Sequence, residues 1–342
     1  MPQEVRMTTA RQRLISLQET TYYHCISRCV RRAWLCGKDP YNGKSFEHRR
    51  QWVLDRLQEL SDIFSIEICA YAILSNHYHV VLHVSVDQAS EWSDVEVAQR
   101  WMRLYKGHLL VDRYLAGEPL VAAERKVVSE LIETWRNRLF DISWFMRCMN
   151  EHLAQRANQE DQCRGRFWEG RFKSQALLDE TAVLTCMSYV DLNPIRAGIA
   201  DTPEESDFTS IQERIRVWQA KSTARTKQNN SETRLRPFVG SSNAHADSGI
   251  EFSLQDYLEL VDWTGRAIRD DKKGSIPNEL LPIMQRLGVE SETWLTSIKH
   301  YNRDYFSVLG ALDRIKTFAQ AQGRAWCRGQ EVARRTYRMA SA

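Results

Sequence analysis

The chain has 342 residues, a formal net charge of +3 and 43% hydrophobic residues, which is typical of a globular protein of two or three domains. We find no amino-terminal signal peptide and no apolar run long enough to cross a bilayer, so we expect a cytoplasmic protein without a membrane partner. Eight cysteines, none of them in a Cys-x-x-Cys pair, argue against a disulfide framework and against a cysteine-based zinc site.

The first part of the chain has the pattern of an α+β unit. Residues 21–30 are rich in β-forming side chains, and residues 46–64 repeat apolar side chains at helical spacing. Residues 66–74 and 77–84 read as two strands that meet at a tight turn. The order strand, helix, strand, strand predicts half of a ferredoxin-like antiparallel sheet with helices on one face, which leaves the other face to carry a site.

The strand predicted at residues 77–84 carries the first candidate site. Successive side chains of a strand point to opposite faces, so one face is apolar while His77 and His79 lie side by side on the other, with His83 further along. Two imidazoles at this spacing on a rigid strand can hold one metal ion. The alternative is a pair of ordinary strand histidines, one buried and one solvated.

The middle of the chain predicts a helical excursion and then a basic loop. Helical patterns at residues 94–115 and 118–139 form the excursion, and a further helix follows at residues 143–159. Residues 165–174 run into a fourth strand at 172–178. Aromatic and basic side chains alternate in this loop, and the candidates for DNA contact are Arg166, Trp168, Arg171 and Lys173.

Basic and aromatic side chains together suit backbone phosphate and an unpaired base. The alternative is an edge strand with packed aromatic rings and solvated arginines. Other basic clusters lie at residues 28–32, 221–236 and 324–338, and each either lines a phosphate-binding surface or forms a solvated helix face.

The helix predicted at residues 180–192 begins after Asp179 and stops at Asn193-Pro194. Tyr189 and Asn193 are four residues apart, so they lie on nearly the same helix face, one turn from each other. A tyrosine in a helix usually serves packing, and an asparagine before proline is most simply a residue that ends a helix.

The rest of the chain predicts a polar linker and a helical extension. A short helix at residues 206–220 precedes a polar segment at 221–249, and more helices are expected at 254–269, 279–287, 292–302 and 303–322. We therefore divide the chain into a first domain at 1–205 with an insertion at about 94–140, a helix and linker at 206–250, and a helical domain at 251–342.

Three motifs occur in a specific order. They are Ser75-Asn76-His77-Tyr78-His79, then Gly170-Arg171-Phe172-Lys173-Ser174, then Tyr189-x-x-Leu192-Asn193-Pro194-Ile195-Arg196-Ala197-Gly198. This set resembles the single-tyrosine HUH transposases of the insertion-sequence-200-like family, and most of all the REP-associated tyrosine transposases of bacteria. The resemblance covers residues 20–200, and the extension after residue 205 has no counterpart in the compact members.

The resemblance implies an HUH nuclease fold and a defined chemistry. His77 and His79 would bind a divalent metal, magnesium or manganese, with Asn193 as a further ligand, and Tyr189 would be the nucleophile. Attack on single-stranded DNA beside a hairpin would give a covalent 5′-phosphotyrosine and a 3′-hydroxyl. The family includes monomers and homodimers, and its DNA substrate implies association with the nucleoid.

Other functions remain open from the sequence. The chain could be a domesticated protein that binds hairpin DNA without cutting it. It could also be an HUH replication initiator or relaxase, although those commonly place the tyrosine elsewhere in the chain. A metal-dependent hydrolase without a covalent intermediate would act independently of Tyr189. A non-enzymatic RNA-binding module is disfavoured because no such motif is present.

Overall fold

The computed structural model describes residues 14–30, 34–39, 43–223, 234–240, 249–269, 280–304 and 307–336. Its centre is a five-stranded sheet of order β2-β3-β1-β4-β5. Neighbouring strands run antiparallel except for β4 and β5, which are parallel. The strands are β1 (Tyr22–Arg28), β2 (Ile66–Ile73), β3 (His77–Val84), β4 (Lys173–Leu177) and β5 (Val308–Leu309). The fold is therefore of the α+β type, with a mixed sheet.

The first four strands lie where the sequence predicted them, and the fifth does not. The pattern of residues 303–322 predicted a helix throughout, which is wrong at β5. The amide nitrogens of Ala176 and Leu178 on the edge of the sheet donate to the carbonyl oxygens of Ser307 and Leu309 at 2.9 Å each. Pairing with an open strand edge satisfies these backbone groups, and no local pattern in the sequence reports it.

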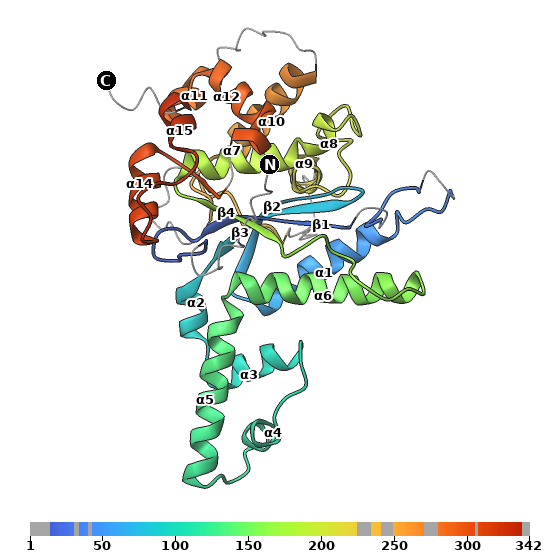
Figure 1. The fold of residues 1–342 in the computed structure, drawn as a ribbon, viewed down its shortest axis with the longest axis vertical. Coiled ribbons are helices and arrows are strands. Elements are labelled where there is room, and N and C mark those ends of the chain that lie inside the picture. Colours follow the sequence, from blue (N-terminus) through green and yellow to red (C-terminus); the bar gives the residue numbers. More distant parts are fainter. Residues whose placement is uncertain are drawn as a thin grey trace, which may run out of the picture.

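Helices cover both faces of the sheet (Figure 1). On one face lie α1 (Arg49–Ile63) and α6 (Ile142–Glu160), and on the other lie α7 (Glu180–Asp191), α9 (Ser210–Thr223), α10 (Leu254–Arg269) and α12 (Ser291–Lys299). The prediction of helices on one face only is therefore wrong. Every residue of α7 from Ala182 to Asp191 is buried, and a helix without a polar stripe needs cover on all sides.

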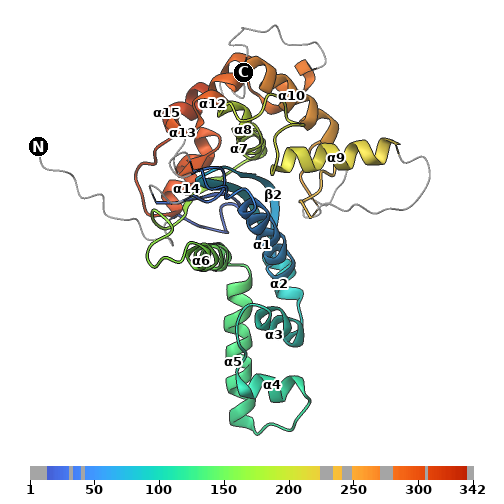
Figure 2. The same cartoon turned by 90° about the vertical axis from the view of Figure 1, so that its right-hand side faces the viewer.

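The remaining helices complete the two layers and form an arm. Close to α7 are α8 (Asn193–Arg196), α11 (Leu281–Leu287) and α13 (Tyr301–Asp304), while α14 (Leu312–Ala321) and α15 (Gln330–Thr336) follow β5. The arm consists of α3 (Asp94–Met102), α4 (Leu109–Leu115) and α5 (Ala122–Leu139), which follow α2 (Val86–Glu91) and project from the body of the molecule (Figures 1 and 2). None of the helices in the described ranges is both long and apolar enough to cross a bilayer.

The arm confirms the helix predicted at residues 118–139, which is α5, and corrects the one predicted at 94–115. Residues 94–115 form two helices instead of one, because the chain turns between Met102 and His108. A Cβ atom at Gly107 would lie 2.8 Å from Met102 Cε, so a side chain here would require the end of Met102 to shift. Stacking of the Trp101 and Trp135 rings, with centroids 5.9 Å apart, joins α3 to α5.

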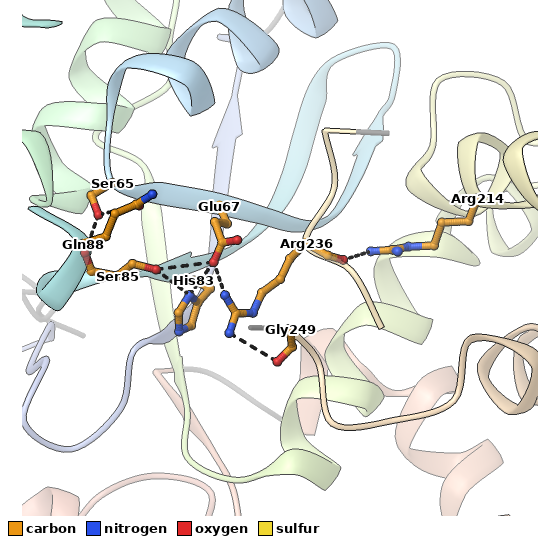
Figure 3. A network of polar contacts seen from close by, with 8 residues as sticks. All are labelled: Ser65, Glu67, His83, Ser85, Gln88, Arg214, Arg236 and Gly249. Carbon is orange, nitrogen blue, oxygen red and sulfur yellow. Dashed lines mark hydrogen bonds and ion pairs between the residues drawn. The ribbon is translucent and has the colours of Figure 1, made fainter. Parts of the chain in front are cut away.

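Part of the predicted polar linker packs on the sheet. The backbone nitrogen of Arg236 donates to the Ile68 carbonyl oxygen at 2.8 Å, and the guanidinium forms an ion pair with Glu67 (Figure 3). Arg236 Nη2 also donates to the Gly249 carbonyl oxygen at 3.2 Å. Because Arg236 is buried, this ion pair anchors residues 234–240 along β2. The rest of the predicted linker lies outside the described residues, apart from the end of α9.

The packing also crosses the predicted domain boundaries. Leu177 of β4, Tyr189 of α7, Leu260 of α10 and Trp294 of α12 belong to one cluster of buried apolar side chains. The helices after residue 250 thus share a hydrophobic core with the strands and with α7. The division of the chain at residues 205 and 250 stays a prediction.

Candidate active site

The period of β3 sets the positions of the two motif histidines. Tyr78 points to the face that packs on α1 and α6, where its hydroxyl donates to Asn150 Oδ1 at 2.8 Å. His77 and His79 therefore share the opposite face, with ring centroids 4.9 Å apart and an interplanar angle of 67°. His83 lies at the far end of the same strand, beside Glu67 at 3.0 Å, and is not part of this group.

The motif histidines have hydrogen-bond partners that suit metal ligation. His77 Nδ1 lies 2.6 Å from Asn76 Oδ1, and because an amide oxygen only accepts, Nδ1 donates and Nε2 keeps its lone pair. His79 Nε2 lies 3.3 Å from Asn193 Nδ2, so the asparagine of α8 comes to the same place. A half-turn of that amide would present its oxygen instead.

Both imidazoles are neutral at pH 7. Burial, with the positive charges of Arg28 and Lys173, lowers the pKa of His77 to about 4. Burial also lowers the pKa of His79 well below its ordinary value, and His24, His77 and Arg196 add to this. A metal ligand must be unprotonated, so this environment keeps the histidines ready to bind.

His24 is a third imidazole in the site that the sequence analysis missed. It lies on β1, opposite Val81 of β3, and its Nε2 is 2.9 Å from His79 Nδ1. On its other side Nδ1 is 3.2 Å from Oε1 of Gln175, which β4 contributes. These contacts depend on the register of three strands that are far apart in the sequence, so no local motif marks His24 or Gln175.

Tyr189 reaches the same place from α7. Its ring centroid lies 5.7 Å from that of His79, and the side chain is 1% exposed. Its hydroxyl donates to Asn302 Oδ1 at 2.9 Å, while the Tyr301 ring stacks on it at 4.1 Å with an interplanar angle of 13°. The Cζ atom of Arg196, on α8, lies 4.7 Å from the centre of the Tyr189 ring. The extension after residue 280 therefore covers the tyrosine, a contact the sequence analysis did not foresee.

A cavity of about 570 Å³ opens over these histidines. Its lining carries basic side chains at Arg28, Arg171 and Lys173, and one acidic side chain at Glu169. The full set of lining residues is His24, Ile26, Arg28, His77, His79, Glu169, Gly170, Arg171, Lys173, Ser174, Gln175, Tyr301 and Asn302. The excess of positive charge suits a polyanion beside the histidines.

Only two of the four residues predicted to contact DNA line this cavity. Arg171 and Lys173 line the cavity and are exposed, and the structure adds Arg28 to them. Arg166 is exposed but lines a second hollow, of about 590 Å³. Trp168 packs on Tyr78 with centroids 5.8 Å apart and donates from Nε1 to the Asn150 carbonyl oxygen at 2.8 Å. Parts of the other three basic clusters lie outside the described residues.

The candidate metal ligands suit a divalent cation that accepts both nitrogen and oxygen donors. Within the described residues, no group of three or more His, Cys, Asp or Glu side chains forms a metal site. The set here is instead two neutral imidazoles and one side-chain amide, from His77, His79 and Asn193. Imidazole accepts manganese and other transition metals, and amide oxygen suits magnesium or manganese.

Comparison with known proteins gives one structural likeness. No protein-family model matches the chain. No curated protein matches it either. Among solved structures, the chain is similar to a REP-associated tyrosine transposase bound to a REP hairpin, with 12% sequence identity and a TM-score of 0.37. The match covers 61% of this chain and 86% of the other.

Proposed function

We propose that this chain cuts and rejoins single-stranded DNA beside hairpins, through a covalent 5′-phosphotyrosine at Tyr189. The observation that carries the proposal is the packing of Tyr189 against His79, which shares a strand face with His77 at the basic cavity, although Tyr189 and His79 are about 110 residues apart in the chain. The order of the three sequence motifs supports the same chemistry. We place the divalent metal, magnesium or manganese, at His77, His79 and Asn193.

In the proposed reaction Tyr189 attacks phosphorus, and the metal ligands hold the cation beside the scissile phosphate. The phenol oxygen of Tyr189 loses its proton and forms a bond to phosphorus, and the bond from phosphorus to the 3′-oxygen breaks. The leaving 3′-oxygen takes up a proton, so one proton is released and one is taken up. A bound divalent metal would neutralise charge on the scissile phosphate. Because the phosphotyrosine keeps the energy of the phosphodiester, a 3′-hydroxyl can reverse the step on another strand without ATP.

The basic lining residues have a binding role in this proposal. Arg28, Arg171 and Lys173 would hold successive phosphates of one strand and guide the scissile phosphate to the histidines. The tyrosine and the histidines come from the same chain, so a monomer has all the groups that the step needs. An exchange of helices within a homodimer is not required.

One observation favours a second candidate, a hairpin-binding protein that does not cut. The side chain of Tyr189 is 1% exposed, and Tyr301 and Asn302 contact it directly. A nucleophile must be reached by phosphorus, so cleavage requires α13 to move. In the silent alternative this cover would be permanent.

The test is a cleavage assay on end-labelled hairpin DNA with single-stranded flanks, taken from sequences next to the encoding gene. Wild type, His77→Ala and His79→Ala are compared with magnesium, with manganese and with a chelator. We expect cleavage with metal only, and a loss of about 100-fold or more in each variant. His152→Ala is the matched control, because this histidine lies on α6 away from the site. Tight hairpin binding by wild type without cleavage in either metal would support the silent alternative.

A further inference from the structure

A continuous chain of hydrogen bonds runs from α13 to His79. The hydroxyl of Tyr301 donates to Gln175 Oε1 at 2.5 Å, and His24 Nδ1 lies 3.2 Å from the same oxygen. His24 Nε2 is 2.9 Å from His79 Nδ1, and His79 Nε2 is 3.3 Å from Asn193 Nδ2. All five residues are buried, none more than 8% exposed, although four of them line the cavity.

The orientations of the Gln175 and Asn193 amides at the two ends of this chain decide where its hydrogens lie. Gln175 Oε1 only accepts, so the hydrogen between it and His24 belongs to His24 Nδ1. At the other end Asn193 Nδ2 only donates, so His79 Nε2 carries no hydrogen and the N–H of this ring lies on Nδ1. The hydrogen between the two histidines therefore sits on His79 Nδ1, and Asn193 Nδ2 donates to the lone pair on His79 Nε2.

We infer that Tyr301, Gln175 and His24 form a positioning relay that holds His79 with its hydrogen on Nδ1 and its Nε2 lone pair directed at the metal position. This inference rests on the proposed function for the assignment of that position. Outer hydrogen-bond partners of a ligating histidine fix its tautomer and ring orientation and raise its basicity. Asn76 does the same for His77 from the neighbouring position in the chain.

Through Tyr301, the carboxy-terminal extension takes part in positioning the site. Tyr301 follows Gln175 by 126 residues in the sequence, yet it supplies the first donor of the relay. The same ring stacks on Tyr189 with centroids 4.1 Å apart. One residue of α13 thus positions both the candidate nucleophile and, through two other side chains, a candidate metal ligand.

Nuclear magnetic resonance tests the relay without DNA and without metal. Long-range proton–nitrogen spectra of the full chain, labelled with nitrogen-15 in histidine and freed of metal by a chelator, report the tautomer of each ring. Single substitutions assign the signals of His24 and His79. We expect both rings to carry hydrogen on Nδ1 at pH 7.5. Hydrogen on His79 Nε2 would overturn the inference, because the Gln175 amide would then point the other way and donate.

Variants separate the relay from simple packing. Tyr301→Phe keeps the stacked ring but removes the hydroxyl, and Gln175→Leu removes the acceptor. Each should give His79 a mixture of tautomers and weaken manganese binding by about 10- to 100-fold. The affinity is measured by titration, with the electron paramagnetic resonance signal of free manganese as the readout. Gln175→Glu keeps an acceptor oxygen and should restore both properties to near the wild-type level.

The controls keep this inference apart from the proposed function. Tyr71→Phe removes a hydroxyl that donates to Glu213 at 2.9 Å and takes no part in the relay, and it should change neither tautomer nor manganese affinity. If Gln175→Leu does not fold, Tyr301→Phe alone decides. Unchanged tautomers and affinity in Tyr301→Phe would refute the relay even if the protein cuts DNA. The expected tautomers in a chain that never cuts would support the relay and count against the cleavage proposal.

Discussion

Asp191 lies two residues after Tyr189 and ties α7 to its neighbours. The carboxyl group is fully buried, accepts from the Ile211 nitrogen at 3.0 Å and the Tyr257 hydroxyl at 2.6 Å, and also accepts from the Ser210 hydroxyl. Burial raises its pKa from 3.8 to about 6, although Ser210 and Tyr257 oppose this and Arg214 does so through its charge. The position of the candidate nucleophile therefore depends on a carboxyl group that titrates near neutral pH.

The sign of the resulting pH effect follows from the raised pKa. The folded state holds the proton more tightly than the unfolded state, so this group stabilises the fold below about pH 4 and loses that contribution as the pH rises through about 6. Two pKa units correspond to about 3 kcal/mol. In Asp191→Asn the contribution is absent, so the stability difference between wild type and variant should shift by about 2 kcal/mol between pH 4.5 and pH 7.5, in favour of wild type at the lower pH.

Denaturant unfolding at the two pH values measures this shift. Comparison of each variant with wild type at the same pH cancels the titration of the other groups. Asp207→Asn serves as the control, because this exposed carboxylate pairs with Arg216 at 3.6 Å and accepts from Gln212 Nε2 at 2.6 Å at the surface, and it should show no comparable shift. A constant difference between wild type and Asp191→Asn across the pH range would contradict the account of this carboxyl group.

At the scale of elements, the ion pair of Arg236 and Glu67 holds residues 234–240 on the outer strand of the sheet. Glu67 Oε2 also lies 3.0 Å from His83 Nδ1, so the pair joins this segment to β2 and β3 together (Figure 3). The Arg236 side chain is 1% exposed and that of Glu67 is 35% exposed. A pair buried on one side costs more to break than a surface pair, but less than one that is buried completely.

Arg236 and Arg234 allow the half-buried ion pair to be compared with a surface ion pair. Arg236→Met should lower the free energy of unfolding by about 2–3 kcal/mol, because Glu67 loses its buried partner. Arg234→Met breaks a pair with Asp62 at 2.8 Å, in which the two side chains are 50% and 41% exposed, and should cost less than about 1 kcal/mol. Thermal and denaturant unfolding measure both values. Equal losses in the two variants would show that residues 234–240 are not anchored by the buried pair.

At the scale of the whole molecule, the candidate site joins segments from both ends of the chain. β1, β3 and β4 supply the histidines and Gln175, α7 and α8 supply Tyr189 and Asn193, and α13 closes the group. Much of this was predictable, because period-two alternation placed His77 and His79 on one face and the helix pattern placed Tyr189 one turn before Asn193.

The rest could not be read from the sequence, for physical reasons. His24 and Gln175 join the site through the register of paired strands, which depends on contacts between distant segments. Tyr301 and Asn302 arrive through the packing of α12 and α13 on α7, and β5 forms because an open strand edge is available. These contacts arise from tertiary packing, and the segments that make them carry no periodic pattern that would reveal them.

The stacked pair of Tyr189 and Tyr301 makes one measurement decisive. The protein is incubated with the hairpin DNA and manganese, then protein and DNA are digested and the peptides are analysed by mass spectrometry for a nucleotide joined through a 5′-phosphate. We expect the modification on Tyr189, its loss in Tyr189→Phe, and its retention in Tyr301→Phe at saturating manganese. A modification on Tyr301, or strand cleavage without any modified tyrosine, would contradict the assignment of Tyr189 as the nucleophile.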